Sequence, residues 1–363
     1  MMSLIPFVKY THCGNNFVMV DELSKFRIPE PEKPFFACRA SDVNFGIGSD
    51  GLLVIQPFNS NILQEINNTY GYWEVLPSAP TNCQYIFRLF ESNRKEALSC
   101  GNGLLCISDY LHQRYKIDNA CVMTELPLTQ PNFISIGFQR EEQLAWCNLG
   151  HPRRVPDKIV PHSGIEYYKE QIDIVYGLKI GFRSHDLHSF TEDTPLMLSC
   201  YLCFTGEPHL VIFPDECMSA ELAGTIFASV EANQREKRRN FGTWLVNHVG
   251  AYINKHYSGR FPFGVNVNFA RVLSAPENII QYRCFERGIN RETLACGTGA
   301  IAVSHVAKTL RLAVGNDKIT IIPYLCNYYE PDTKIFITIK DDGIQLNGKP
   351  NPLFAGKFIY KTA

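Results

Sequence analysis

Two cysteines, Cys100 and Cys296, stand in matching sequence surroundings in the two halves of the chain. Each is followed by Gly-x-Gly, is preceded four residues earlier by a glutamate, and lies shortly after an aromatic-Arg-x-Phe-Glu block; the matching stretches are residues 87–101 and 282–297. A shared order of this many residue types indicates an internal duplication, so we interpret the chain as two homologous halves. Each half is therefore expected to supply one thiol to a common reaction.

The chemistry follows from the expected position of these thiols. Apolar residues at helical spacing follow both turns, over 104–111 and 300–310, so each cysteine is predicted at a helix N-terminus. The positive end of a helix stabilises a thiolate, and its unpaired backbone N–H groups bind anions. If the two domains face each other, Cys100 and Cys296 lie on opposite sides of one cleft. One thiolate can then remove a proton from the α-carbon of a bound carboxylate while the other thiol delivers one, with no metal and no cofactor. The predicted reaction is stereoinversion.

Short strands are predicted around these helices. Runs rich in β-branched or aromatic residues and bounded by Gly, Asn or Pro occur at 17–20, 52–55, 86–90, 210–213 and 319–322. A Gly-polar turn opens a strand in each half, at Gly14 and at Gly206, and the Pro-rich stretch 126–131 suits a crossing between halves. We predict an α/β (α+β) fold of two pseudo-symmetric domains, residues 1–128 with about 350–363 (Cys100) and residues 129–349 (Cys296).

Composition excludes several classes of partner. The net charge of -1 offers no field for nucleic acid or an anionic membrane surface. No apolar run is long enough to span a bilayer, and the first residues lack both a charged leader and a long hydrophobic segment. The 13 cysteines are odd in number and irregularly spaced, which favours reduced thiols over a disulfide framework. We expect a cytoplasmic protein without nucleic-acid or membrane partners.

Six motifs, in order along the chain, resemble those of the diaminopimelate epimerase family. They are Gly-Asn-Asn-Phe at 14–17, Gly-Ile-Gly-Ser-Asp-Gly at 46–51, Cys-Gly-Asn-Gly at 100–103, Gly-Glu-Pro-His at 206–209, Glu-Arg-Gly at 286–288 and Ala-Cys-Gly-Thr-Gly at 295–299. The resemblance implies domains in which strands wrap a central helix, no cofactor, a homodimer, and Cys100 and Cys296 as the acid–base pair. The motifs at 99–103 and 286–288 favour the epimerases over the related proline racemase and phenazine-pathway isomerase.

Departures from the family pattern bear on the substrate. Glu91 and Glu207 stand where the family has asparagines that hold the distal end of diaminopimelate, while Arg287 and Asn266 keep the family positions. Two acids would repel a distal carboxylate and attract a cation, so we expect lysine, ornithine, arginine or histidine as the substrate. The residues predicted to contact substrate are Asn15, Glu91, Gly101, Asn102, Glu207, His209, Asn266, Glu286, Arg287, Gly297 and Thr298.

Three alternatives stay open. The first is an authentic diaminopimelate epimerase converting the LL to the meso form for lysine biosynthesis or peptidoglycan precursors. The second is a Cys–His hydrolase using His209, which leaves the duplicated Cys-Gly-x-Gly unexplained. The third is an inactive amino-acid-binding protein, which has no need for two opposed bases.

Two further patterns are assigned to structure rather than chemistry. The Cys200-x-x-Cys203 pair lies in an apolar run with no second pair or histidine cluster nearby, so we expect a core strand rather than a zinc or redox site. Apparent additions to the family pattern around 59–83, 160–200 and 230–262 have no readable function.

Overall fold

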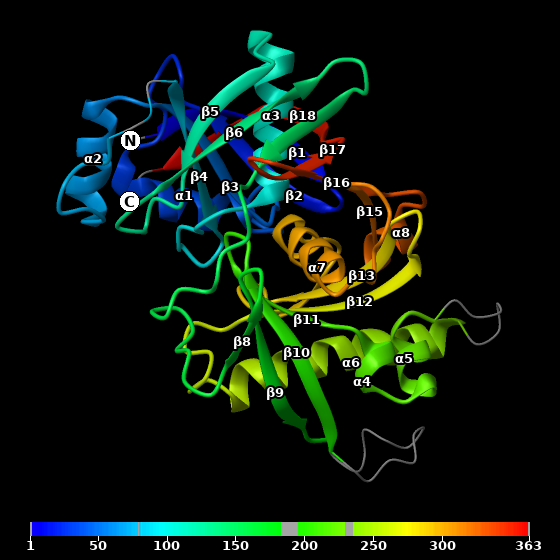
Figure 1. The fold of residues 1–363 in the computed structure, drawn as a ribbon. Helices are drawn as coiled ribbons and strands as arrows, with labels where there is room; N and C mark the ends of the chain where they lie inside the picture. The colour runs from blue at the N-terminus through cyan, green and yellow to red at the C-terminus, as the bar shows by residue number, and fades with distance from the viewer. Residues whose placement is uncertain (1, 79, 81, 183–194, 229–234, 362–363) are drawn as a thin grey trace. The chain divides into compact units, whose positions relative to one another are not determined.

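The computed structural model describes residues 2–78, 80, 82–182, 195–228 and 235–361, so part of the predicted addition at 160–200 and part of that at 230–262 lie outside the described residues. The chain divides into two compact units, and Figure 1 shows both. Unit 1 comprises Met1–Gly150 with Gln345–Ala363, and unit 2 comprises His151–Ile344. No helix among the described residues is long and apolar enough to cross a membrane.

Unit 1 is built on a mixed sheet whose strands pair in the order β18–β1–β2–β3–β4–β5–β6–β7–β17. The pairs β2–β3 and β4–β5 are parallel and the other pairs are antiparallel. The strands are β1 (Met2–His12), β2 (Asn15–Asp21), β3 (Gly51–Pro57), β4 (Cys83–Glu91), β5 (Asn119–Thr124), β6 (Asn132–Gln139), β7 (Leu144–Asn148), β17 (Gly343–Gly348) and β18 (Asn351–Lys361).

Helix α3 (Gly101–Tyr115) is the centre of unit 1. It lies against β1, β6 and β7, and its residues from Gly101 to Asp109 are all buried. A helix buried on every side needs apolar or small residues all round, which the Gly-Asn-Gly-Leu-Leu-Cys-Ile-Ser sequence supplies. Gly103 allows close packing here, because a Cβ would lie 2.9 Å from the Leu53 side chain and 3.2 Å from that of Phe87. Outside this core are η1 (Glu30–Glu32), α1 (Lys33–Ser41) and α2 (Ser60–Tyr70).

Unit 2 repeats this plan. Its strands pair in the order β8–β9–β10–β11–β12–β13, after which β13 pairs with both β14 and β15, and β15 pairs with β16. The pairs β11–β12 and β13–β15 are parallel, matching β2–β3 and β4–β5 of unit 1. The strands are β8 (Glu166–Lys169), β9 (Ile172–Ile180), β10 (Leu196–Phe204), β11 (Pro208–Ile212), β12 (Asn266–Ser274), β13 (Ile279–Glu286), β14 (Arg291–Thr293), β15 (Lys318–Pro323) and β16 (Ile335–Lys340).

Helix α7 (Gly297–Thr309) has the place in unit 2 that α3 has in unit 1. It contacts β10, β11, β12, β13, β15 and β16, and the residues from Gly297 to Ser304 are all buried. The longer helix α6 (Arg235–His256) packs with α5 and against β9, β12, β13 and β14. The remaining helices are α4 (Pro214–Cys217), α5 (Ala220–Ile226) and α8 (Tyr324–Tyr329).

The fold confirms the predicted architecture of strands around two equivalent central helices. The five predicted strand runs fall on strands, except that Phe213 lies one residue beyond the end of β11. Unit 1, however, extends past the boundary predicted at residue 128. The Pro-rich stretch 126–131 joins β5 to its antiparallel partner β6, and Leu126 is 1% exposed in the unit 1 core. The prolines mark a turn within the sheet rather than a linker. Cys200 and Cys203 are buried in β10, as expected of a core strand.

Candidate active site

Cys100 lies at the N-terminus of α3, as the sequence predicts. It is the N-cap residue, with an extended backbone (φ -153°), and its sulfur accepts a hydrogen bond from the backbone N–H of Gly103 at 3.4 Å. The thiol is only partly buried. The first turn of α3 therefore directs a backbone N–H group at a sulfur that is not fully buried.

A buried histidine supports this turn. Asn102, two residues after the cysteine, is 2% exposed; its Oδ1 lies 2.9 Å from Nδ1 of His12 and its Nδ2 donates to Oδ1 of Asn15 at 2.9 Å. Burial lowers the pKa of His12 to about 4, so the ring is neutral at pH 7 and donates to Asn102. Asn15 and Asn102, both predicted substrate contacts, are thus brought together in unit 1.

Cys296 is the N-cap residue of α7 and is 7% exposed. Its sulfur lies 3.4 Å from Oγ1 of Thr298, and the Tyr282 hydroxyl both accepts from its backbone N–H at 2.7 Å and donates to its carbonyl oxygen at 2.9 Å. A hydrogen bond from the Cys284 thiol lowers the pKa of Cys296, against the effect of burial, which raises it. The surroundings of Cys296 therefore favour its thiolate form.

The second cysteine also has a buried histidine. His209, fully buried, places Nε2 3.0 Å from Oγ1 of Thr298, the residue two positions after Cys296, and Nδ1 3.0 Å from Nδ2 of Asn268. Burial lowers the pKa of His209 to about 3. In both units a neutral histidine thus fixes the polar side chain at the start of the central helix. His209 therefore positions Thr298.

The buried histidines predict a specific acid sensitivity. A histidine with a depressed folded pKa takes up its proton on unfolding, so its stabilising effect is present above the unfolded pKa of about 6.5 and is lost as the pH falls towards 4. For His12 the loss amounts to about 3 kcal/mol by pH 4. We expect His12→Gln to flatten the fall in unfolding free energy between pH 6.5 and 4, measured by denaturant titration at each pH. The exposed His256→Gln variant is the control; equal slopes in wild type and His12→Gln would contradict this assignment.

Three of the predicted residues form one charged group in unit 2. The Arg287 guanidinium makes an ion pair with Glu207 and donates to the carbonyl oxygen of Phe263 at 2.6 Å. The backbone N–H of Arg287 donates to Oδ1 of Asn266 at 2.9 Å. Glu207 is therefore not an isolated negative charge, contrary to the expectation from sequence, because an arginine of the same unit neutralises it.

Glu91 and Glu286 end equivalent strands, β4 and β13. Glu91 accepts a hydrogen bond from Nδ2 of Asn93 at 2.8 Å, whereas Glu286 accepts one from the Thr293 hydroxyl. Glu286 also lies close to Cys296, since a carboxylate oxygen of Glu286 and the sulfurs of Cys284 and Cys296 are all within 4.8 Å of one another. The structure thus places Glu286 beside one predicted catalytic thiol.

Buried ion pairs connect the strands to the loops that carry the cysteines. Arg88 on β4 binds Glu96 through Nε at 2.8 Å and Nη2 at 2.7 Å, and Arg283 on β13 binds Glu292 in the same way, at 2.6 and 2.7 Å. Each glutamate precedes its cysteine by four residues. In each sequence block the duplicated Arg therefore pairs with the duplicated Glu. The ion pair ties the segment before each cysteine to the neighbouring strand.

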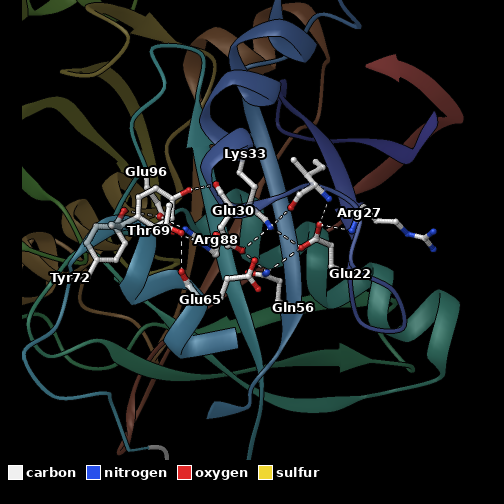
Figure 2. Close-up of polar contacts among 12 residues, drawn as sticks. Glu22, Arg27, Glu30, Lys33, Gln56, Glu65, Thr69, Tyr72, Arg88 and Glu96 are labelled. Atoms are coloured by element: carbon white, nitrogen blue, oxygen red, sulfur yellow. Dashed lines mark hydrogen bonds and ion pairs between the residues drawn. The ribbon is translucent and has the colours of Figure 1, made fainter. Parts of the chain in front are cut away.

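In unit 1 the pair belongs to a larger network, which Figure 2 shows. Arg88 also pairs with Glu30, and Lys33 bridges Glu30 at 2.7 Å and Glu22 at 3.0 Å. Burial raises the pKa of Glu30, but Arg88 and Lys33 together bring it below its usual value. Two cations and three carboxylates are buried together here, so removing a cation leaves carboxylates without their ion-pair partner.

Sequence reasoning missed His12, Tyr282, Cys284, Asn268 and Thr293. Tyr282 and Cys284 lie inside the duplicated block, and alternation along a strand would have put Cys284 on the same face as Glu286. His12 has no counterpart at the same spacing, because it approaches its helix from β1 whereas His209 approaches from β11. Only the three-dimensional structure shows that both histidines contact the residue two positions after a cysteine.

The chain is similar in sequence to curated proteins. The chain is similar to the diaminopimelate epimerase of Archaeoglobus fulgidus, with 28% identity over 324 residues covering 88% of this chain and 86% of that protein. It is similar to the diaminopimelate epimerase of Acinetobacter baumannii, with 25% identity over 303 residues, 83% of this chain and 81% of that protein. No family model matches the chain.

Solved structures share the fold at low sequence identity. A hydroxyproline epimerase from Agrobacterium vitis superposes with a TM-score of 0.56 at 10% identity, over 98% of this chain and 93% of that one. A methylitaconate-delta-isomerase superposes with a TM-score of 0.53 at 10% identity, over 99% of this chain and 96% of that one. The predicted fold is thereby confirmed. The chain is an isomerase whose sequence is similar to those of diaminopimelate epimerases.

Proposed function

We propose that the protein inverts the α-carbon of an amino acid, with Cys100 and Cys296 as the acid–base pair and without a cofactor. The observation that carries the proposal is the duplicated arrangement: in each unit a cysteine caps a buried helix, and a buried neutral histidine holds the polar residue two positions later. A binding protein or a single-nucleophile hydrolase needs only one such arrangement.

The proposed reaction moves one proton in and one proton out. A thiolate accepts the α-proton, and the C–H electron pair stays on the substrate as a carbanion whose charge spreads onto the carboxylate. The opposite thiol then donates its proton to the other face of the carbon. Helix N-termini bind negative charge through their unpaired N–H groups, so both α3 and α7 would stabilise the intermediate. The thiols exchange roles when the substrate has the opposite hand.

For the substrate, we propose an amino acid with a cationic side chain. Glu207 and Glu286 together outweigh Arg287 by one negative charge, and the Arg287 guanidinium is already engaged by Glu207 and by Phe263. A distal carboxylate would have to displace Glu207 from Arg287, whereas an ammonium or guanidinium meets two acids. The alternative is LL-diaminopimelate, which the names of the relatives favour. We further propose a cytoplasmic homodimer.

The substrate proposal predicts the effect of removing Glu207. Wild type should turn over at least one of lysine, ornithine, arginine or histidine with a higher kcat/KM than LL-diaminopimelate. Glu207→Asn, alone or with Glu91→Asn, frees Arg287 and should move the preference towards diaminopimelate by roughly 1–3 kcal/mol per acid removed. The measurement is α-proton exchange in D2O across amino acids, followed by kcat/KM for each substrate.

The exposed Glu277→Asn variant serves as the control for charge in general. If wild type prefers diaminopimelate and Glu207→Asn leaves the ratio of kcat/KM values unchanged, Glu207 does not act on the substrate. The protein would then be a diaminopimelate epimerase.

A further inference from the structure

Three donor groups of unit 2 lie close to the thiol of Cys296. Cys284 and Glu286 are two residues apart on β13, so their side chains point to the same face of the sheet, and α7 begins at Cys296 over that face. The sulfurs of Cys284 and Cys296 and a carboxylate oxygen of Glu286 lie within 4.8 Å of one another. Both thiols are buried, Cys284 at 1% exposure. The cluster therefore combines two soft sulfur donors with one oxygen donor.

A fourth donor has no hydrogen-bond partner. Asn268 on β12 pairs directly with Cys284 across the antiparallel ladder, so both side chains lie on the same face. Its Nδ2 donates to Nδ1 of His209 and to the carbonyl oxygen of Leu210, both at 3.0 Å, which fixes the direction of its oxygen. That oxygen is fully buried and accepts no hydrogen bond within the described structure.

The Asn268 oxygen lies near the thiol of Cys296. A Cβ built on Gly299 would lie 2.5 Å from Oδ1 of Asn268 and 3.4 Å from Sγ of Cys296, so both atoms border the same point. A buried acceptor without a donor destabilises the fold. Such a cost is offset when a ligand binds the oxygen.

We propose that Cys284, Glu286, Cys296 and Asn268 form a binding site for a thiophilic divalent cation of the zinc class. Two thiolates and two oxygens make a tetrahedral donor set typical of zinc, and thiolates select against magnesium and calcium. Zinc–ligand distances of about 2.0–2.3 Å put neighbouring donors roughly 3–4 Å apart, so the cluster contracts by only about 1 Å on binding.

Charge and protons balance in this site. Both sulfurs bind as thiolates, and a thiol that is still protonated loses its proton to solvent as the metal binds, so binding releases up to two protons. Two thiolates and one carboxylate then leave the filled site with a net charge of -1, which the N-terminus of α7 stabilises. The cation is an inhibitor, not a cofactor, because it occupies the Cys296 thiolate. This last consequence depends on the proposed catalytic role of Cys296, whereas the binding itself does not.

Metal binding can be measured without activity. We expect purified wild type to bind one Zn²⁺ per chain in competition with a chromophoric chelator, to release protons to solvent on binding, and to lose alkylation of Cys296. Cys284→Ala should weaken Zn²⁺ binding by more than about tenfold. Cys203→Ala, which removes another buried thiol of the same unit, should bind as wild type does. Equal affinity in Cys284→Ala and wild type would overturn the site.

X-ray absorption on the zinc-loaded wild type keeps the test independent of how the variants fold. Two sulfur scatterers at about 2.3 Å with oxygen completing the shell are expected. Fewer than two sulfurs, or no stoichiometric binding, would refute the proposal. If zinc binds as expected but does not inhibit α-proton exchange, the metal site stands and the proposed role of Cys296 fails.

Discussion

Replacing either Cys100 or Cys296 with alanine is expected to abolish inversion of the substrate while leaving the fold intact. Inversion needs both a base and an acid, and each thiol serves as base for one hand and acid for the other. General acid–base groups contribute about 10²–10⁴-fold each, so a loss of at least that size is expected for either variant. The measurement is chiral chromatography of the product, with far-ultraviolet circular dichroism to verify the fold.

Matched controls separate catalysis from the loss of any thiol. Cys38→Ala in unit 1 and Cys217→Ala in unit 2 remove partly buried thiols outside the predicted site, and both should keep near wild-type rates. Alanine at Cys100 alone is expected to permit at most one-sided proton exchange through Cys296. Near-normal racemisation by either Cys100→Ala or Cys296→Ala would rule out the two-thiol mechanism.

The second large effect is expected at Arg88. Arg88→Met leaves Glu96 and Glu30 buried with their shared counter-charge removed, and breaking one partner of a buried ion pair costs about 3–5 kcal/mol. We expect a loss of that size in the free energy of unfolding, measured by guanidinium titration. The loop before Cys100 should also open, because Glu96 anchors it, and hydrogen exchange around 96–100 should rise.

Arg140 provides the comparison within the same unit. Its ion pair with Asp118 lies at the surface, where the Arg140 side chain is 62% exposed, so Arg140→Met should cost less than about 1 kcal/mol. The double variant Arg88→Met with Glu96→Gln should recover part of the loss, since it removes one of the stranded charges. Equal destabilisation by Arg88→Met and Arg140→Met would show that burial of the network contributes nothing.

The duplicated architecture could be predicted from sequence because its determinants are local. Helical spacing after each Cys-Gly-x-Gly turn and β-branched runs bounded by Gly and Pro each specify an element within a few residues, and these elements occur as predicted. The position of each thiol at a helix N-terminus follows from the same local signal.

The pairings within the site could not be predicted in this way, because they depend on partners far apart in sequence. From sequence, Glu207 is expected to be a free acid. Its ion-pair partner Arg287 is 80 residues away, so only the structure shows the pair. Asn268 and Cys284 become neighbours only through the register of β12 on β13. Unit 1 also ends later than predicted. A proline-rich turn between two strands of one sheet and a proline-rich linker between two domains have the same sequence pattern, so the sequence does not distinguish them.

The pairing of β18 with β1 has a consequence for biosynthesis. The register joins Met2 to Lys361 and Thr11 to Asn351, so β1 acquires this neighbour only after more than 350 residues have been translated. Unit 2 is continuous in sequence and its chain is complete earlier. Until β18 is made, the nascent chain carries an unpaired edge on β1, and that edge is a template for intermolecular strand pairing.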